Sequence, residues 1–118
     1  MCLNNWGGID HKVLEFHEYV NLFSGKSGSG KSTVMDAIQV ILYGSFSPSF
    51  LNKAADDAKN RRSVLSYLRG EQKDGSANRK DCDFCSVIAL EIEDTGTHIT
   101  TCIGIAFDVR KSDSKIKK

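Results

Sequence analysis

The sequence predicts an α/β fold with a central mixed sheet, one helix that follows a glycine-rich loop, and antiparallel β-hairpins. Three observations predict it. A pair of short apolar segments joined by a turn occurs near each end of the chain. Three glycines lie close together within residues 24–31, and apolar residues recur at helical spacing directly after them. The 118 residues are enough for one domain with a modest core.

The first part of the chain predicts three strands. Residues 2–6 form a short apolar and polar run that ends at Gly7 and Gly8, which indicate a turn. Residues 11–17 alternate between apolar and polar side chains, so we expect them to pair with the first strand as a hairpin. Residues 19–24 carry apolar side chains on both faces, which is typical of a strand that is buried on both sides.

Two helices are predicted after the loop. The first begins near Lys31 and stops at Gly44, and its apolar residues cover both broad faces, so we expect protein to cover most of it. Residues 45–52 contain the only proline and indicate a loop. A weaker pattern over 56–68 predicts a second helix that ends at Gly70.

The last third of the chain predicts a second hairpin. Residues 71–83 are polar and contain glycine, which indicates a mobile connection. Residues 85–92 and 98–109 are rich in β-branched side chains, and Asp94-Thr95-Gly96 lies between them as a turn. We therefore expect one domain over residues 1–110 and a basic, disordered tail over 111–118.

Composition excludes few classes of function. The net charge of +1 does not by itself indicate a nucleic acid or a membrane as a partner. Since no run approaches the ~20 apolar residues of a membrane span, and no signal peptide is visible, we expect a cytoplasmic protein without a membrane partner. In that reducing compartment, the four cysteines are expected to be free thiols.

The glycine-rich loop matches the pattern G-x-x-x-x-G-K-[ST] at every fixed position. Glycines let backbone N–H groups point inward around a phosphate, and the helix that follows directs its positive end at the same anion. The pattern is specific, and the expected strand and helix flank it. The sequence therefore predicts binding of ATP and Mg²⁺ by these residues: Gly25, Lys26, Ser27, Gly28, Ser29, Gly30, Lys31, Ser32 and Thr33.

Three of these residues have side-chain roles. Lys31 supplies a positive charge for the β and γ phosphates. Ser32 offers a hydroxyl group to Mg²⁺, which prefers oxygen ligands, and it is the one predicted metal ligand. Thr33 is placed near the α phosphate. No catalytic residue is assigned.

Residues 3–44 resemble the start of an SMC-type ATPase head, the ABC-class head of chromosome-organising and DNA-repair proteins. The resemblance rests on the NNW and VLEF segments, the NLFSGKSGSGKST loop and the MDAIQVILYG helix. The segments FLNKAADDAKNRRSVLSYLRGE, SVIALEIED and IGIAFDVR are similar to the MukB-like branch, which includes the JetC-type subunits of Wadjet plasmid-defence systems.

The resemblance implies a P-loop NTPase N-lobe from a split head. In such heads a coiled coil and a C-terminal lobe follow, and that lobe brings the signature motif and the Walker B acidic pair. No signature motif is found in the sequence. The nearest candidate for the Walker B pair is Ile92-Glu93-Asp94, but it falls in the expected turn between two strands. The chain is thus expected to be a fragment that binds ATP but scarcely hydrolyses it alone. Its expected partners are ATP, the C-terminal lobe or a second head of a homodimer, and DNA through the full complex.

Weaker signals leave alternatives open. Cys82 and Cys85 form a CxxC pair that His98, Cys102 or Cys2 would have to complete as a zinc site, so incidental thiols are favoured.

The resemblance places Asn5 and Trp6 near the adenine, although Trp6 is equally well explained as a core anchor. Four basic residues lie on or near the predicted second helix. One of them is a candidate for reaching the nucleotide, and the simpler interpretation is that all of them lie on a face exposed to solvent. The candidates are Lys53, Arg61, Arg62 and Arg69.

Two other functions compete with the ATP-binding lobe. One is a non-functional remnant without enzymatic activity. The other is a free-standing P-loop kinase or GTPase. A kinase needs a Walker B aspartate and a lid with arginines, and a GTPase needs an N-K-x-D motif. Neither is present, although Asn52-Lys53 begins the second.

Overall fold

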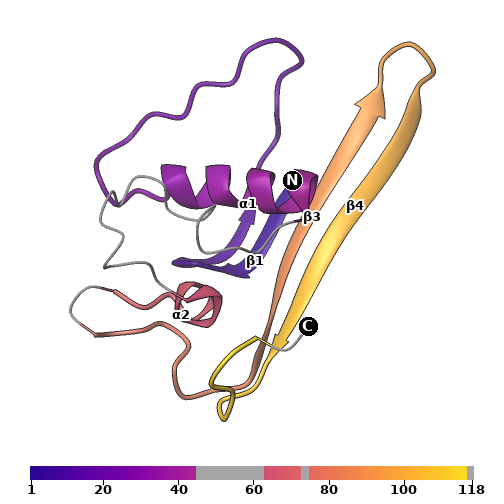
Figure 1. Cartoon of the computed structure of the whole chain (residues 1–118). Coiled ribbons are helices and arrows are strands. Elements are labelled where there is room, and N and C mark those ends of the chain that lie inside the picture. The colour runs from indigo at the N-terminus through magenta and orange to yellow at the C-terminus, as the bar shows by residue number, and fades with distance from the viewer. Residues whose placement is uncertain (45–62, 73–74, 117–118) are drawn as a thin grey trace.

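The computed structural model describes residues 1–44, 63–72 and 75–116. Within them the chain forms a four-stranded sheet with two helices beside it (Figure 1). The elements are β1 (Cys2–Trp6), β2 (Ile9–Val13), α1 (Lys31–Tyr43), α2 (Val64–Leu68), β3 (Phe84–Asp94) and β4 (Ile99–Val109).

The sheet has the strand order β2-β1-β3-β4, and every pairing in it is antiparallel. The α/β class is confirmed, but the predicted mixed sheet is wrong for the described residues. A mixed sheet needs at least one strand that is parallel to a neighbour. The expected strand at 19–24, directly before the glycine-rich loop, was the candidate for that position. The structure assigns no strand to those residues.

Both predicted hairpins are present. In the first, Trp6 pairs with Ile9, so the connecting turn is Gly7-Gly8 and the second strand covers 9–13 rather than 11–17. In the second, strands of 11 residues pair from Phe84–Val109 to Asp94–Ile99. The Asp94 carboxylate accepts hydrogen bonds from the N–H groups of Gly96 and Thr97, at 2.8 and 3.1 Å, which stabilises this turn.

The hydrophobic core lies between the sheet and the helices. Strand alternation places Ile88 of β3 and Phe107 and Val109 of β4 on the face that the helices cover. Trp6 is fully buried and contacts two aromatic rings, with centroids 5.0 Å from Tyr67 and 6.2 Å from Phe107. This tryptophan therefore joins the first hairpin to α2 and β4.

α1 begins and ends where the sequence predicts. Gly44 adopts a left-handed conformation and donates its N–H to the Val40 carbonyl, a common way to end a helix. Most residues of the helix are buried or half-buried, as expected, but Met35, Leu42 and Tyr43 are exposed. The buried face of the helix consists of Val34, Asp36, Ala37, Val40 and Ile41.

The described part of the predicted second helix is helical and ends, as predicted, before Gly70. It covers Val64–Leu68, and Ser63 caps it by accepting the N–H of Ser66 at 3.0 Å. The rest of the prediction, residues 56–62, lies outside the described residues, as does the loop predicted at 45–52.

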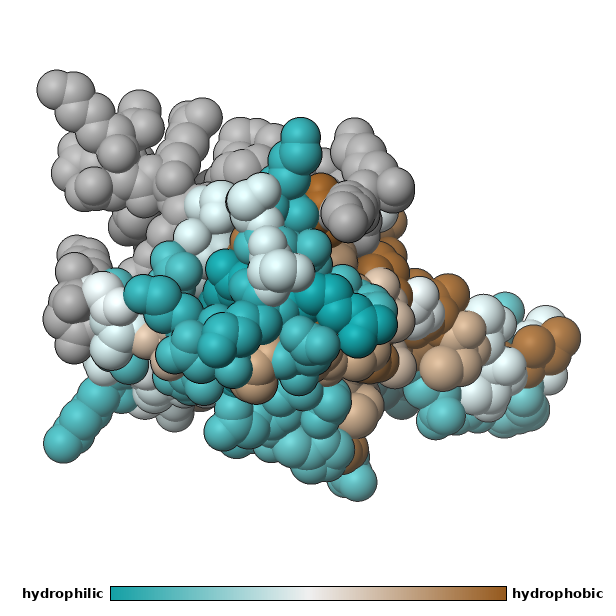
Figure 2. All heavy atoms as spheres, turned by 90° about the horizontal axis from the view of Figure 1, so that it is seen from below, coloured by the Kyte–Doolittle hydropathy of each residue, from teal (hydrophilic) through white to brown (hydrophobic). Residues whose placement is uncertain are grey.

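Exposed apolar side chains are distributed unevenly. Tyr19, Val20 and Leu22 are 87%, 77% and 87% exposed, in the segment that extends away from the sheet above α1 in Figure 1. The face seen in Figure 2 is mainly hydrophilic, and its hydrophobic residues gather towards one side of the view. Tyr19, Val20 and Leu22 are thus apolar side chains that this chain does not cover, whereas Phe23 of the same segment is half-buried against the core.

Candidate nucleotide-binding site

The predicted phosphate loop is exposed, and its backbone has the conformation that its glycines permit. Gly25, Gly28 and Gly30 have φ angles of 151°, 83° and 88°. The backbone angle at Gly25 favours glycine, and a Cβ atom there would lie 2.7 Å from Oγ of Ser29, so a side chain would also displace that hydroxyl. The N–H of Ser29 donates to the Lys26 carbonyl at 3.2 Å, which closes the turn.

The loop closes around the ammonium group of Lys31. Its Nζ donates hydrogen bonds to the carbonyl oxygens of Gly25 and Lys26, at 2.6 and 2.9 Å, and to Oγ of Ser29 at 3.2 Å. The acceptors of these three bonds are all neutral oxygens. Because charged oxygens accept stronger hydrogen bonds from an ammonium group, a polyphosphate can compete for it.

The start of α1 is open to an anion. Gly30 is the N-cap residue and no side chain caps the helix, while its first turn contains no acidic residue. The N–H of Val34 is the first to find a helical acceptor, at the Gly30 carbonyl. Helix geometry gives the N–H groups before it no acceptor within α1, so they and the positive end of the helix dipole can bind a phosphate beside Lys31.

Two elements of the first hairpin hold this end of α1. The indole Nε1 of Trp6 donates to the carbonyl of Thr33 at 2.9 Å. Gly7 approaches the same residue so closely that a Cβ atom on it would lie 2.9 Å from Cγ2 of Thr33. Trp6 is a core anchor, and with no exposed surface it cannot stack on adenine.

The other residues considered from the sequence have structural contacts. Asn5 donates its side-chain amide to the Cys85 carbonyl at 2.9 Å. Nη2 of Arg69 donates to the carbonyls of Arg110, Lys111 and Asp113, at 3.3, 3.0 and 3.1 Å, so Arg69 holds the chain after β4 rather than a nucleotide. The other three basic candidates, Lys53, Arg61 and Arg62, lie outside the described residues.

Cys82 and Cys85 are exposed thiols. In the described part of the chain, no three His, Cys, Asp or Glu side chains gather as a metal site requires. The ranges 1–44, 63–72 and 75–116 likewise contain no helix that is long and apolar enough to cross a membrane.

The sequence did not reveal the burial of two polar side chains, those of Asp36 and Arg79. Asp36 of α1 accepts a hydrogen bond from the hydroxyl of Tyr67 at 3.1 Å, and both residues are buried. Arg79 is 6% exposed, although it lies in the segment expected to be a mobile connection. Asp36 and Tyr67 are 31 residues apart, so no local pattern indicated their hydrogen bond. The sequence around Arg79 is polar, so it did not indicate burial.

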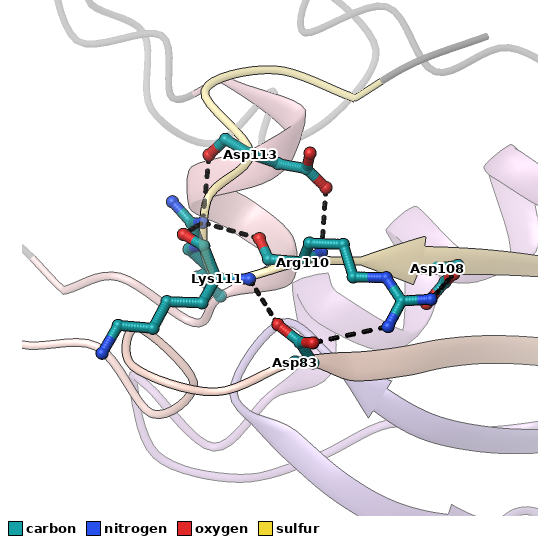
Figure 3. Close-up of polar contacts among 6 residues, drawn as sticks. Asp83, Asp108, Arg110, Lys111 and Asp113 are labelled. Atoms are coloured by element: carbon teal, nitrogen blue, oxygen red, sulfur yellow. Dashed lines mark hydrogen bonds and ion pairs between the residues drawn. The ribbon is translucent and has the colours of Figure 1, made fainter.

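A cluster of charges holds the chain after β4 (Figure 3). The Asp83 carboxylate accepts the backbone N–H of Lys111 at 2.7 Å and contacts the Arg110 guanidinium at 3.4 Å. The hydrogen bond from Lys111, and then the Arg110 guanidinium, hold the pKa of Asp83 below its ordinary value. The carboxylates of Asp83 and Asp108 raise the pKa of Arg110, so this cluster is charged at neutral pH.

Comparison with known proteins supports the phosphate-loop assignment. Residues 1–58 match the family model described as the P-loop containing region of AAA domain. The chain is 33% identical over 72 residues to the SbcC component of the nuclease SbcCD from Staphylococcus haemolyticus, over 58% of this chain and 6% of that protein. It is 28% identical over 103 residues to the DNA replication and repair protein RecF of Francisella tularensis subsp. novicida, over 83% of this chain and 29% of that protein.

No solved structure matches the chain. The chain spans less than a third of the length of either relative. The comparisons therefore support a P-loop region similar to those of SMC-like ATPases. The similarity extends over only a part of each relative.

Proposed function

We propose that this chain binds Mg-ATP through residues 25–33 and forms the N-terminal lobe of an SMC-like ATPase head of the MukB-like branch, with JetC-type subunits as the finer assignment. One observation carries the proposal. A glycine loop closes around the Lys31 ammonium group at the start of a helix that no side chain caps. This arrangement brings a positive charge and the N–H groups of the first helical turn, which have no acceptor within the helix, together at one exposed place.

Each side chain has a proposed role. Lys31 exchanges its contacts with loop oxygens for phosphate oxygens. Ser32 is exposed on the first turn of α1, where its hydroxyl is accessible as a ligand for Mg²⁺, and a bound metal would neutralise phosphate charge. Thr33 is half-buried, and its carbonyl is held by Trp6, which fixes the backbone that faces the α phosphate.

The proposed partner is the second lobe of the head, or a second head. Two observations support it. The chain covers 29% of the RecF protein and 6% of the SbcC protein. The segment before the loop, which has the apolar pattern of a strand, exposes Val20 and Leu22 by 77% and 87%. A strand from the partner would cover these side chains and satisfy their backbone groups.

Hydrolysis is proposed to require that partner. Phosphoryl transfer needs a positioned water molecule and charge stabilisation from several sides, whereas this loop supplies one side. DNA is proposed as a partner of the complete cytoplasmic assembly, consistent with the replication and repair role in the name of the RecF relative.

Thermal unfolding with and without Mg-ATP tests the proposal. We expect saturating Mg-ATP to raise the melting temperature, because a ligand that binds only the folded state stabilises it by about 2.7 kcal/mol at a hundredfold excess over its Kd. Lys31→Ala should abolish the rise, while Lys12→Ala, a change at an exposed lysine of β2, should preserve it. A chain without a cooperative melt would instead favour the non-functional remnant.

A further inference from the structure

The turn between β1 and β2 is held in place by one buried arginine. Nη2 of Arg79 donates to the carbonyl of Gly7 and, at 3.2 Å, to the carbonyl of Leu68. Nε donates to the same Leu68 oxygen at 3.3 Å. Nη1 forms an ion pair with Asp10 at 2.6 Å. One guanidinium group thereby joins the turn, the first residues of β2 and the end of α2.

The surroundings of Arg79 are built to hold this group in place. The backbone N–H of Arg79 donates to the Arg69 carbonyl at 3.0 Å, and its Cζ lies 5.5 Å from the centre of the Phe84 ring. At Gly70 a Cβ atom would lie 2.8 Å from the Gly7 oxygen, so only glycine leaves room for the bond from Arg79. Burial lowers the pKa of Arg79, with the Asp10 charge opposing it, and the group stays charged at neutral pH.

The turn held by Arg79 touches the phosphate end of α1. Gly7 lies against the side chain of Thr33, and the adjacent Trp6 donates to the Thr33 carbonyl. Ile9, on the other side of the turn, lies 3.9 Å from the place of a Cβ atom at Gly30, the N-cap of α1. The turn thus lies against Thr33, and Ile9, the residue after it, lies close to Gly30 at the start of the same helical turn.

We propose that Arg79 is a positioning residue for the nucleotide site. It fixes the Gly7 carbonyl, and the turn that Gly7 belongs to fixes the register of residues 30–33 against the hairpin. The charge of Arg79 does not itself contact the nucleotide. The identity of the ligand rests on the proposed function. That Arg79 holds the turn against the start of α1 concerns the nucleotide-free chain and can be tested separately.

Two variants weaken the contacts of Arg79: one removes the guanidinium group from the core, and the other removes only its ion pair with Asp10. Arg79→Lys keeps the positive charge and the stem but loses the planar fork that reaches two carbonyls and a carboxylate together. Asp10→Asn removes the ion pair at a side chain that is 80% exposed, so it leaves the core intact. Arg110→Gln is the matched control, because Arg110 also pairs with carboxylates but lies in the exposed cluster after β4.

Hydrogen exchange of the nucleotide-free proteins tests the structural part. Arg79→Lys should speed exchange of the hydrogen-bonded amides at residues 34–36 about tenfold, and Asp10→Asn should speed it severalfold, because both variants weaken charge-assisted hydrogen bonds that hold the turn against the helix start. Exchange in β4 should not change. Equal acceleration everywhere would show a general loss of stability, and no acceleration would show that Arg79 does not hold the helix start. Either result overturns the proposal.

Mg-ATP affinity tests the functional part, with fluorescence of Trp6, the only tryptophan, as the signal. Arg79→Lys should raise the Kd about tenfold and Asp10→Asn less, whereas Arg110→Gln should match the wild type. If the wild type itself does not bind, the proposed function fails while the exchange result still stands. If the wild type binds and both the Arg79 and Asp10 variants bind equally well, the positioning role fails. Should Arg79→Lys not fold, Asp10→Asn decides.

Discussion

The two ends of the phosphate loop are held very differently. At the helix end, Thr33 contacts a buried tryptophan and a close-packed glycine, and a buried arginine fixes the turn behind them. At the strand end, Tyr19, Val20 and Leu22 are more than three-quarters exposed although they are large and apolar. The helix end of the loop is therefore held by buried contacts within this chain, whereas these three side chains at the strand end are solvent-exposed.

Paired leucine truncations give the largest expected contrast between these ends. Leu68→Ala removes a fully buried side chain beside the turn that Arg79 holds and should destabilise the fold by about 2–5 kcal/mol. Leu22→Ala changes a side chain that is 87% exposed and should alter stability by less than about 0.5 kcal/mol. Urea unfolding of the isolated chain measures both. A large loss in Leu22→Ala would show that the strand end is packed after all.

A pair of neighbouring glycines gives the next contrast. Gly7→Ala places a methyl group against Thr33 at a φ angle of +53°, so we expect a loss of about 1–3 kcal/mol and weaker Mg-ATP binding. Gly8→Ala is the control, because nothing lies within 4 Å of its Cβ position. Thermal unfolding compares the two, and equal stability of both variants would contradict the close contact between the turn and α1.

The smallest expected effect is the pH dependence of the charge cluster after β4, which belongs to neither end of the loop. The folded-state pKa of Asp83 is lowered, so its stabilising contribution is present above its unfolded pKa of about 3.9 and is lost as the pH falls through the folded value. Asp83→Asn should therefore lower the melting temperature slightly at pH 7 and not at strongly acidic pH. A difference that stays constant with pH would contradict the charged contact.

Local patterns predicted the elements that depend on local chemistry. The glycine loop and Gly44 gave both limits of α1, and Asp94-Thr95-Gly96 gave the turn of the second hairpin. Residues 19–24 were wrongly expected to form a strand in the sheet, because an apolar pattern indicates which side chains favour burial but not whether this chain supplies the partner strand.

Phosphate binding by residues 25–33 stays a prediction, and the residues that support this loop were not predicted. The motif identified Lys31 and the loop glycines, since phosphate binding requires those residue types in that order. It gave no signal for Arg79, because a charged residue in a polar segment is usually solvated and its burial here depends on contacts with Gly7 and Leu68 far away in sequence. The polar character of 71–83 therefore wrongly indicated a loose connection at Arg79.

The most direct test of the central claim is a titration of the labelled chain with Mg-ATP, followed by the NMR shifts of its backbone amides. We expect the largest shifts at Gly28, Gly30, Lys31 and Ser32, with β4 unaffected and no such shifts in Lys31→Ala. Saturating shifts elsewhere, or none in the loop under conditions where the chain is folded, would contradict it.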